Sequence, residues 1–199
     1  FLIADVSGKG IPAAMFMMNA KAVLKSYAES GLDVNKVFTL GNEKLCEGND
    51  AGMFVTAWMG FLNTETGEVT FANAGHNPPL VRHADGSFEY LKVRAGFVLA
   101  GMEGVKYRKN ELQLAPGDVI YLYTDGVTEA TNINDELYGE DRLLALLNAN
   151  KEASMEKLCK LVKEDVFAFA GEAPQFDDIT MLALKYCGAT APTNQEEAL

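Results

Sequence analysis

Three acidic turns are the parts of this sequence best suited to chemistry. Each places an aspartate beside a turn next to an apolar run, and they contain Asp5, Asp125 and the pair Asp177 and Asp178. Strand ends on a rigid sheet can hold separated carboxylates together, but burying several like charges is costly unless a cation neutralises them. Oxygen ligands favour Mg²⁺ or Mn²⁺, whereas a zinc site would use more Cys or His. The turns therefore indicate a site where hard divalent cations activate water and neutralise a phosphoryl group.

Each turn also has a purely structural interpretation. An Asp-Gly pair after a strand is most often only a turn, which is the commoner case for Asp125 taken alone. The Asp177-Asp178 pair alone could equally connect a helix to a strand. The turn at 7–10 lacks the glycine spacing and the Lys-Ser/Thr ending of a phosphate loop, so it does not indicate nucleotide binding. His76 stands in a Gly-His-Asn-Pro turn and is more typical of a structural hydrogen-bonding residue than of a catalytic base.

Composition limits the class of protein. The chain has 199 residues, 48% of them hydrophobic, which is enough for the core of one domain. Its net charge of −11 and the lack of a basic substrate channel argue against nucleic acid and disfavour a metal-dependent nuclease. The two His and the widely spaced Cys46, Cys159 and Cys187 exclude a zinc finger and predict buried, free thiols in a reducing cytoplasm. No apolar run approaches the roughly 20 residues of a membrane span.

The elements that position the acidic turns follow from hydrophobic periodicity. An apolar run at 1–6 predicts a central, buried strand that ends in a glycine-rich turn. Helical spacing covers 13–27, 34–47, 141–148 and 154–170, where Ser154 is the expected N-cap. Strand patterns cover 53–62, 68–74, 80–83, 88–93, 107–114, 119–123 and 179–186. Helices segregated from antiparallel strands indicate an α+β layered domain, with sheet in the middle and helices outside.

Six segments, in the same order along the chain, carry a family resemblance. They are Asp5-Val-Ser-Gly-Lys-Gly-Ile-Pro-Ala-Ala14, Ala72-Asn-Ala-Gly-His-Asn-Pro-Pro79, Pro116-Gly-Asp118, Tyr123-Thr-Asp-Gly-Val-Thr-Glu-Ala130, Tyr138-Gly139 and Asp177-Asp-Ile-Thr180. With these motifs the chain resembles, from residue 1 to about 186, the bacterial SpoIIE-type (RsbU-like) serine/threonine phosphatases. Those enzymes belong to the metal-dependent protein phosphatase (protein phosphatase 2C-like) superfamily.

The resemblance implies a fold, a reaction and a ligand set. The fold is an αββα sandwich of two mainly antiparallel sheets flanked by helices, with two Mn²⁺ or Mg²⁺ ions at one end. The reaction is hydrolysis of phosphoserine or phosphothreonine on a regulatory protein, commonly an anti-sigma-factor antagonist, by a metal-activated water. Asp5 would bridge both ions, with the Val6 carbonyl as a further ligand. Asp125 and Asp177 would complete the first metal site, and Asp178 is the alternate acid; Asp5, Asp125 and Asp177 are the catalytic residues.

The sequence departs from the family pattern at two places. Family members carry an earlier strand with a Gly-Gly-Asp motif, which is absent from residues 1–199, so we expect a phosphatase domain at 1–187 whose first strands are missing and a flexible tail or linker at 188–199. Some relatives in the wider superfamily have a His two residues after the bridging aspartate, where this chain has Ser7. The proton for the leaving group must then come from water or elsewhere.

The resemblance also implies partners. Such domains sit behind sensor or receiver modules in cytoplasmic or membrane-attached proteins, and their first helices, here within 11–47, act as a switch and a dimer contact. Core packing is the simpler explanation of the apolar stripe in that segment. The competing hypothesis is a catalytically silent module that binds a partner protein through the same fold. The presence of all four aspartates, Asp5, Asp125, Asp177 and Asp178, argues against it.

Overall fold

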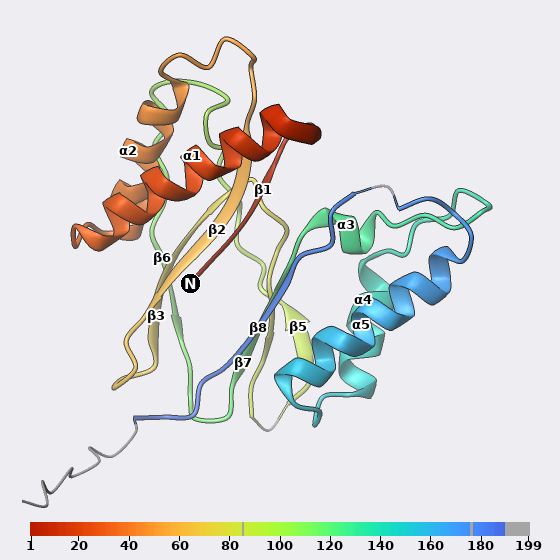
Figure 1. The fold of residues 1–199 in the computed structure, drawn as a ribbon. Coiled ribbons are helices and arrows are strands. Elements are labelled where there is room, and N and C mark those ends of the chain that lie inside the picture. The colour runs from red at the N-terminus through yellow and green to blue at the C-terminus, as the bar shows by residue number, and fades with distance from the viewer. Residues whose placement is uncertain (85, 176, 190–199) are drawn as a thin grey trace, which may run out of the picture.

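Two antiparallel sheets face each other in the centre of the molecule, and helices cover their outer sides (Figure 1). The computed structural model describes residues 1–84, 86–175 and 177–189, and within them eight strands form two four-stranded sheets. One sheet has the order β1-β2-β3-β6 and the other β5-β4-β7-β8. The αββα sandwich expected from the sequence is confirmed.

The bounds of the elements agree with the hydrophobic periodicity. The strands are β1 Leu2–Val6, β2 Val55–Leu62, β3 Glu68–Ala74, β4 Leu80–Arg82, β5 Phe88–Tyr90, β6 Asn110–Gln113, β7 Val119–Tyr123 and β8 Met181–Lys185. The helices are α1 Gly10–Glu29, α2 Val34–Cys46, α3 Asp125–Thr128, α4 Glu140–Ala149 and α5 Met155–Ala170. The sequence did not predict the short helix α3. Among the described residues, no helix combines the length and the apolar composition that crossing a bilayer requires.

Three apolar clusters hold the four layers together. One lies between α1, α2 and the first sheet and includes Leu24 and Phe38, both fully buried. A second lies between α4, α5 and the second sheet. The third fills the space between the two sheets, where Trp58 stacks on Phe71 with ring centroids 5.1 Å apart. At the start of α5, the Ser154 hydroxyl accepts a hydrogen bond from the Lys157 amide at 3.3 Å, so the predicted N-cap is confirmed.

Two expectations about burial are wrong. The strand at the start of the chain is not central: β1 lies at an edge of its sheet within the described residues and pairs only with β2, so most of its side chains are half-buried. An apolar run does not by itself distinguish an edge strand from a central one. The cysteines are free, as expected, but Cys46 and Cys159 are half-buried and Cys187 is exposed. Of the expected tail, residues 190–199 lie outside the described residues.

Candidate metal centre

The first acidic turn joins β1 to α1. Asp5 lies on β1 opposite Thr56 of β2, and the backbone then turns through Gly8 and Gly10, whose φ angles of +80° and +81° suit glycine. Ser7 fixes the turn to β2, because its amide donates to the Phe54 carbonyl at 2.8 Å and its hydroxyl accepts from the Phe54 amide at 2.9 Å. The end of β1 therefore holds Asp5 and the Val6 carbonyl on a rigid edge.

The second and third acidic turns are bonded to each other. Thr124, at the end of β7, has a buried hydroxyl that donates to the Asp178 carbonyl and accepts from the Thr180 amide, each at 3.0 Å. The Thr124 amide also donates to the Thr180 carbonyl at 3.0 Å. Gly126 lies so close to the other turn that a Cβ there would stand 2.3 Å from the Asp178 carbonyl oxygen. The turn carrying Asp177 and Asp178 is thus held directly against the start of α3.

The carboxylates at these turns repel one another. Burial, together with the neighbouring Asp125 and Asp177 carboxylates, raises the pKa of Asp5 from 3.8 to about 6. Asp125 Oδ1 is buried and has no hydrogen-bond partner among the described residues. Asp177 accepts from the Asp178 amide at 2.8 Å and faces Lys9 Nζ at 3.9 Å. The site is therefore short of positive charge, as a site for a cation should be.

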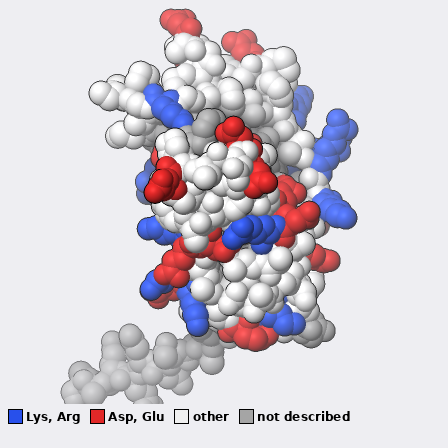
Figure 2. Space-filling view, turned by 90° about the vertical axis from the view of Figure 1, so that its right-hand side faces the viewer, with Lys and Arg blue, Asp and Glu red and all other residues white. Residues whose placement is uncertain are grey.

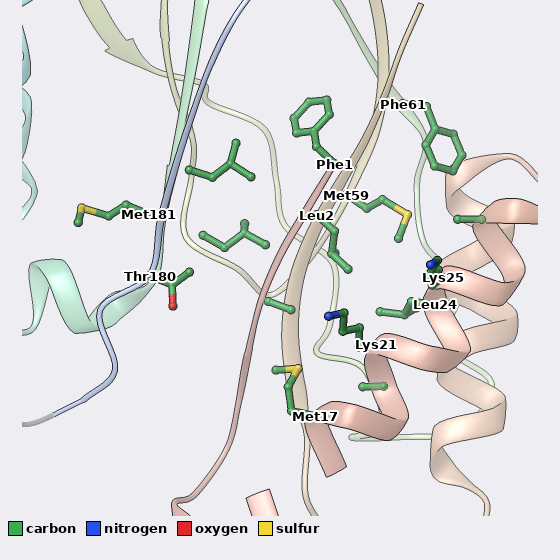
Figure 3. A pocket seen from close by; sticks show the side chains of 15 residues that line it. Phe1, Leu2, Met17, Lys21, Leu24, Lys25, Met59, Phe61, Thr180 and Met181 are labelled. Atoms are coloured by element: carbon green, nitrogen blue, oxygen red, sulfur yellow. The ribbon is translucent and has the colours of Figure 1, made fainter. Parts of the chain in front are cut away.

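A polar pocket of about 630 Å³ opens beside these acids. Its lining includes Asp5, Asp177 and Asp178, together with the Gly8–Gly10 turn and the first turn of α1. A second pocket of about 540 Å³ lies next to it, between β1 and α1 on one side and β8 on the other (Figure 3). Its walls are mainly apolar and carry no acid, so only the first pocket suits a cation.

The donor atoms at the site are oxygens, which hard divalent ions prefer, but the side chains are not yet arranged as a complete set of ligands. Across the described ranges, no three His, Cys, Asp or Glu side chains are grouped closely enough to hold a metal. Three features still favour a cation: only oxygen donors converge, one buried carboxylate oxygen lacks a partner, and Asp5 is hard to ionise. A bound ion would give the unpartnered Asp125 oxygen a partner and would stabilise the ionised form of Asp5.

Most sequence-predicted site residues come together. Asp5, Asp125 and Asp177 interact electrostatically, whereas Asp178 is exposed at the rim of the pocket. His76 has the expected structural role: its Nδ1 lies 2.9 Å from Thr56 Oγ1, and burial lowers its pKa to about 4.

Two residues of the site were not predicted from the sequence. These are Thr124 and Gly126, which connect the two turns. Both stand in the motif that contains Asp125, and a threonine and a glycine flanking a candidate ligand were the only available signal.

Comparison with known proteins places this geometry in a family. The chain is 32% identical over 184 residues to phosphoserine phosphatase RsbU of Bacillus subtilis, covering 92% of this chain and 54% of RsbU. It is 30% identical over 210 residues to protein IcfG of Synechocystis, covering 92% of this chain and 33% of IcfG. The chain thus spans a third to about half the length of these curated relatives.

Solved structures share the fold. The SiaA-PP2C domain of Pseudomonas aeruginosa superposes with a TM-score of 0.79 at 23% identity, covering 93% of this chain and 74% of that one. The catalytic domain of serine threonine protein phosphatase PstP, solved in complex with two manganese ions, gives a TM-score of 0.65 at 14% identity, covering 92% of this chain and 85% of that one. The family model for stage II sporulation protein E matches residues 1–186. Because this match covers nearly the whole chain, the chain belongs to the SpoIIE family.

Proposed function

We propose that this chain is the catalytic domain of a metal-dependent protein serine/threonine phosphatase. The observation that carries the proposal is the meeting of Asp5, Asp125 and Asp177 beside one polar pocket, where they repel one another. The similarity to RsbU, a phosphoserine phosphatase, supports the same activity. The reaction is hydrolysis of phosphoserine or phosphothreonine on a regulatory protein.

The cofactors of this proposal are two Mn²⁺ or Mg²⁺ ions. Asp5 would hold both, with the Val6 carbonyl as a further ligand; Asp125 and Asp177 would complete the first site, and Asp178 is the alternate acid. The two manganese ions of PstP support this assignment. When bound, such ions supply a nucleophilic water and neutralise the phosphoryl group.

Residues of the chain itself favour an anionic substrate at the same place. Lys9 and the first turn of α1 line the pocket, and Lys9 Nζ lies 3.9 Å from Asp177 Oδ2. The positive end of a helix attracts phosphate oxygens, and a nearby ammonium group adds to that attraction. The part of the pocket wall formed by Lys9 and the start of α1 would therefore attract a phosphoryl group.

The test is Mn²⁺-dependent release of phosphate from a phosphorylated partner protein. We expect the full-length protein to release phosphate with Mn²⁺ and to lose this activity with a chelator. The Asp125→Asn variant should lose it as well, while keeping the fold. A folded, Mn²⁺-loaded protein that releases no phosphate from its partner or from p-nitrophenyl phosphate would overturn the proposal.

A second candidate is a silent module that binds a partner without catalysis. The absence, among the described residues, of a closed group of three ligands favours it. Calorimetry with Mn²⁺ separates the two candidates: a phosphatase binds the ion and loses binding in Asp5→Asn, whereas a silent module shows no binding that depends on Asp5.

The partners of this proposal follow from the family. The substrate is a phosphorylated anti-sigma-factor antagonist, and residues 1–187 form a cytoplasmic catalytic domain that follows a sensor or receiver domain. We also propose a homodimer through α1, because Ile11, Met15 and Met18 are 77%, 66% and 72% exposed and lie on one helical face. Light scattering on Met15→Glu/Met18→Glu tests it: a dimer should become a monomer.

A further inference from the structure

Positive charge is concentrated in the loop between β5 and β6. Residues 92–109 contain five Lys or Arg, namely Lys92, Arg94, Lys106, Arg108 and Lys109, and Glu103 as their one acid, which gives +4 in a chain of net charge −11. On the side that carries α4 and α5, by contrast, charges of both signs are interspersed (Figure 2). The loop is therefore a local exception to the acidic character of the chain.

Three of these cations surround a small cavity. Arg94, Lys106 and Arg108 line a space of about 220 Å³ with Asn73, Phe97 and Asn110. The three cationic side chains are exposed, and within the part of the chain that the structure describes none of them forms an ion pair or a side-chain hydrogen bond. Their charge is thus available to an anionic ligand. We call Arg94, Phe97, Lys106 and Arg108 the basic loop patch.

The loop that carries the patch is fixed to the body of the domain. Asn42 of α2 is fully buried; its Nδ2 donates to the Met102 carbonyl at 2.9 Å, and its Oδ1 accepts from the Ala100 amide at 2.9 Å. The Gly96 amide donates to the Asn73 carbonyl at 2.8 Å. Because these bonds already order the loop, a ligand that binds to it does not have to offset the conformational entropy of ordering it, which favours recognition.

The patch lies at the same end of the first sheet as the acidic pocket. Val6 pairs with Val55, and Val55 exchanges two backbone hydrogen bonds with Leu99 of the basic loop, at 3.0 and 2.9 Å. Two strand spacings therefore separate Leu99 from the end of β1, a distance of about 10 Å. Gly96, next to the patch, forms a β-bridge with Ala74 of β3, which is one strand further from β1 than β2 is. An extended peptide advances about 3.3 Å per residue, so roughly five residues bridge the pocket and the patch.

We propose that the basic loop patch binds an acidic segment of the phosphoprotein substrate, about five residues from the phosphorylated side chain. This inference rests on the phosphatase function proposed above. Phe97, 51% exposed, adds an apolar anchor of the kind that interfaces use beside charged contacts. A protein segment fits better than nucleic acid, because a long polyanion would run from the patch onto a surface that is acidic on balance.

The test compares two phosphoserine peptides of equal length and sequence, except that one carries three Glu and the other three Gln about five residues from the phosphoserine. With Mn²⁺ and the full-length protein at low salt, we expect kcat/KM to be about tenfold higher for the Glu peptide, mostly through KM. The triple variant Arg94→Glu/Lys106→Glu/Arg108→Glu should abolish this preference. High salt should reduce it.

The matched control is Lys157→Glu/Lys160→Glu/Lys163→Glu, which makes the same change in charge on α5, beside the other sheet. It should keep the preference, and both triple variants should hydrolyse p-nitrophenyl phosphate at the wild-type rate. Fluorescence anisotropy measures the affinity for both peptides without turnover. A protein that is inactive on every substrate would therefore refute the proposed function but not the patch. Equal binding of the two peptides by the wild type would overturn the patch. Tighter binding of a single-stranded oligonucleotide than of the Glu peptide would overturn it too.

Discussion

Gly126→Ala is the sharpest test of how the proposed metal centre is assembled. The new methyl carbon would lie 2.3 Å from the carbonyl oxygen and 2.9 Å from the carbonyl carbon of Asp178. Both are backbone atoms, so no rotation of a side chain can relieve the contact. To restore even 3.0 Å, the turn at 177–178 must move by at least about 0.7 Å relative to α3.

This displacement should cost both stability and catalysis. Overpacking of a close backbone contact destabilises by about 1–3 kcal/mol, which we expect in the free energy of unfolding measured with urea. A shift of this size in a group that positions the reaction lowers the rate by about 100-fold. We therefore expect kcat/KM for p-nitrophenyl phosphate to fall by about that factor, and the Mn²⁺ concentration that gives half-maximal activity to rise.

A second glycine provides the control. At Gly86 the nearest atom to an added Cβ is the His83 carbonyl oxygen at 3.7 Å, an ordinary contact far along the chain from the acidic turns. Gly86→Ala should change the free energy of unfolding by less than about 0.5 kcal/mol and leave activity intact. If Gly126→Ala keeps the wild-type Mn²⁺ dependence and kcat/KM, the inferred packing of the 177–178 turn on α3 is wrong.

Three further substitutions probe the same site. Asp125→Asn should lower kcat/KM by at least about 100-fold, because it removes a proposed ligand, while Asp135→Asn, an exposed position, should not; a stopped phosphate-release assay compares them. Asp5→Asn without metal should raise the free energy of unfolding by about 1 kcal/mol at pH 7.5, since a half-exposed carboxyl whose pKa is raised from 3.8 to about 6 opposes folding once ionised. That gain should shrink as the pH falls from 6 to below 4, where the carboxyl is protonated in both states; denaturant titrations across this range would contradict the idea if the gain were constant. Thr124→Val should cost about 1–3 kcal/mol and weaken Mn²⁺ binding, because it leaves two backbone groups of the 177–180 turn without partners; calorimetry that finds unchanged Mn²⁺ affinity would argue against it.

Periodicity predicted most of the fold because each layer buries one face of each element. Apolar residues at helical spacing predict a helix that packs on a sheet, as with Ala20 and Leu24 on α1 and Val37 and Phe38 on α2. All four side chains are buried. The helix α3 escaped prediction because its four residues are too few to show a helical period. Its formation depends on tertiary contacts with the 177–180 turn.

Spatial relations between distant segments were the part that the sequence could not supply. The acids of the site were found because each stands beside a recognisable turn. The bonds from Thr124 to the turn at 177–180 span more than fifty residues, and no local pattern reports them. The basic loop patch was missed for a different reason: the net charge of −11 was judged over the whole chain, which conceals a segment of +4 at 92–109.

The two missed features together bear on how one end of the sandwich would bind the proposed phosphoprotein substrate. Thr124 extends the pairing of β7 with β8 as far as the 177–180 turn, so Asp125 and Asp177 are held near each other despite their repulsion. Above pH 6, where Asp5 is ionised, a bound cation would relieve this repulsion, which ties metal binding to the stability of this end of the domain. The loop at 92–109, bonded to β2 through Leu99 and to β3 through Gly96, places positive charge on the same sheet as Asp5. Repulsion at the pocket would turn away an acidic substrate unless such a counter-charge attracted it, so the basic loop patch complements the acidic centre.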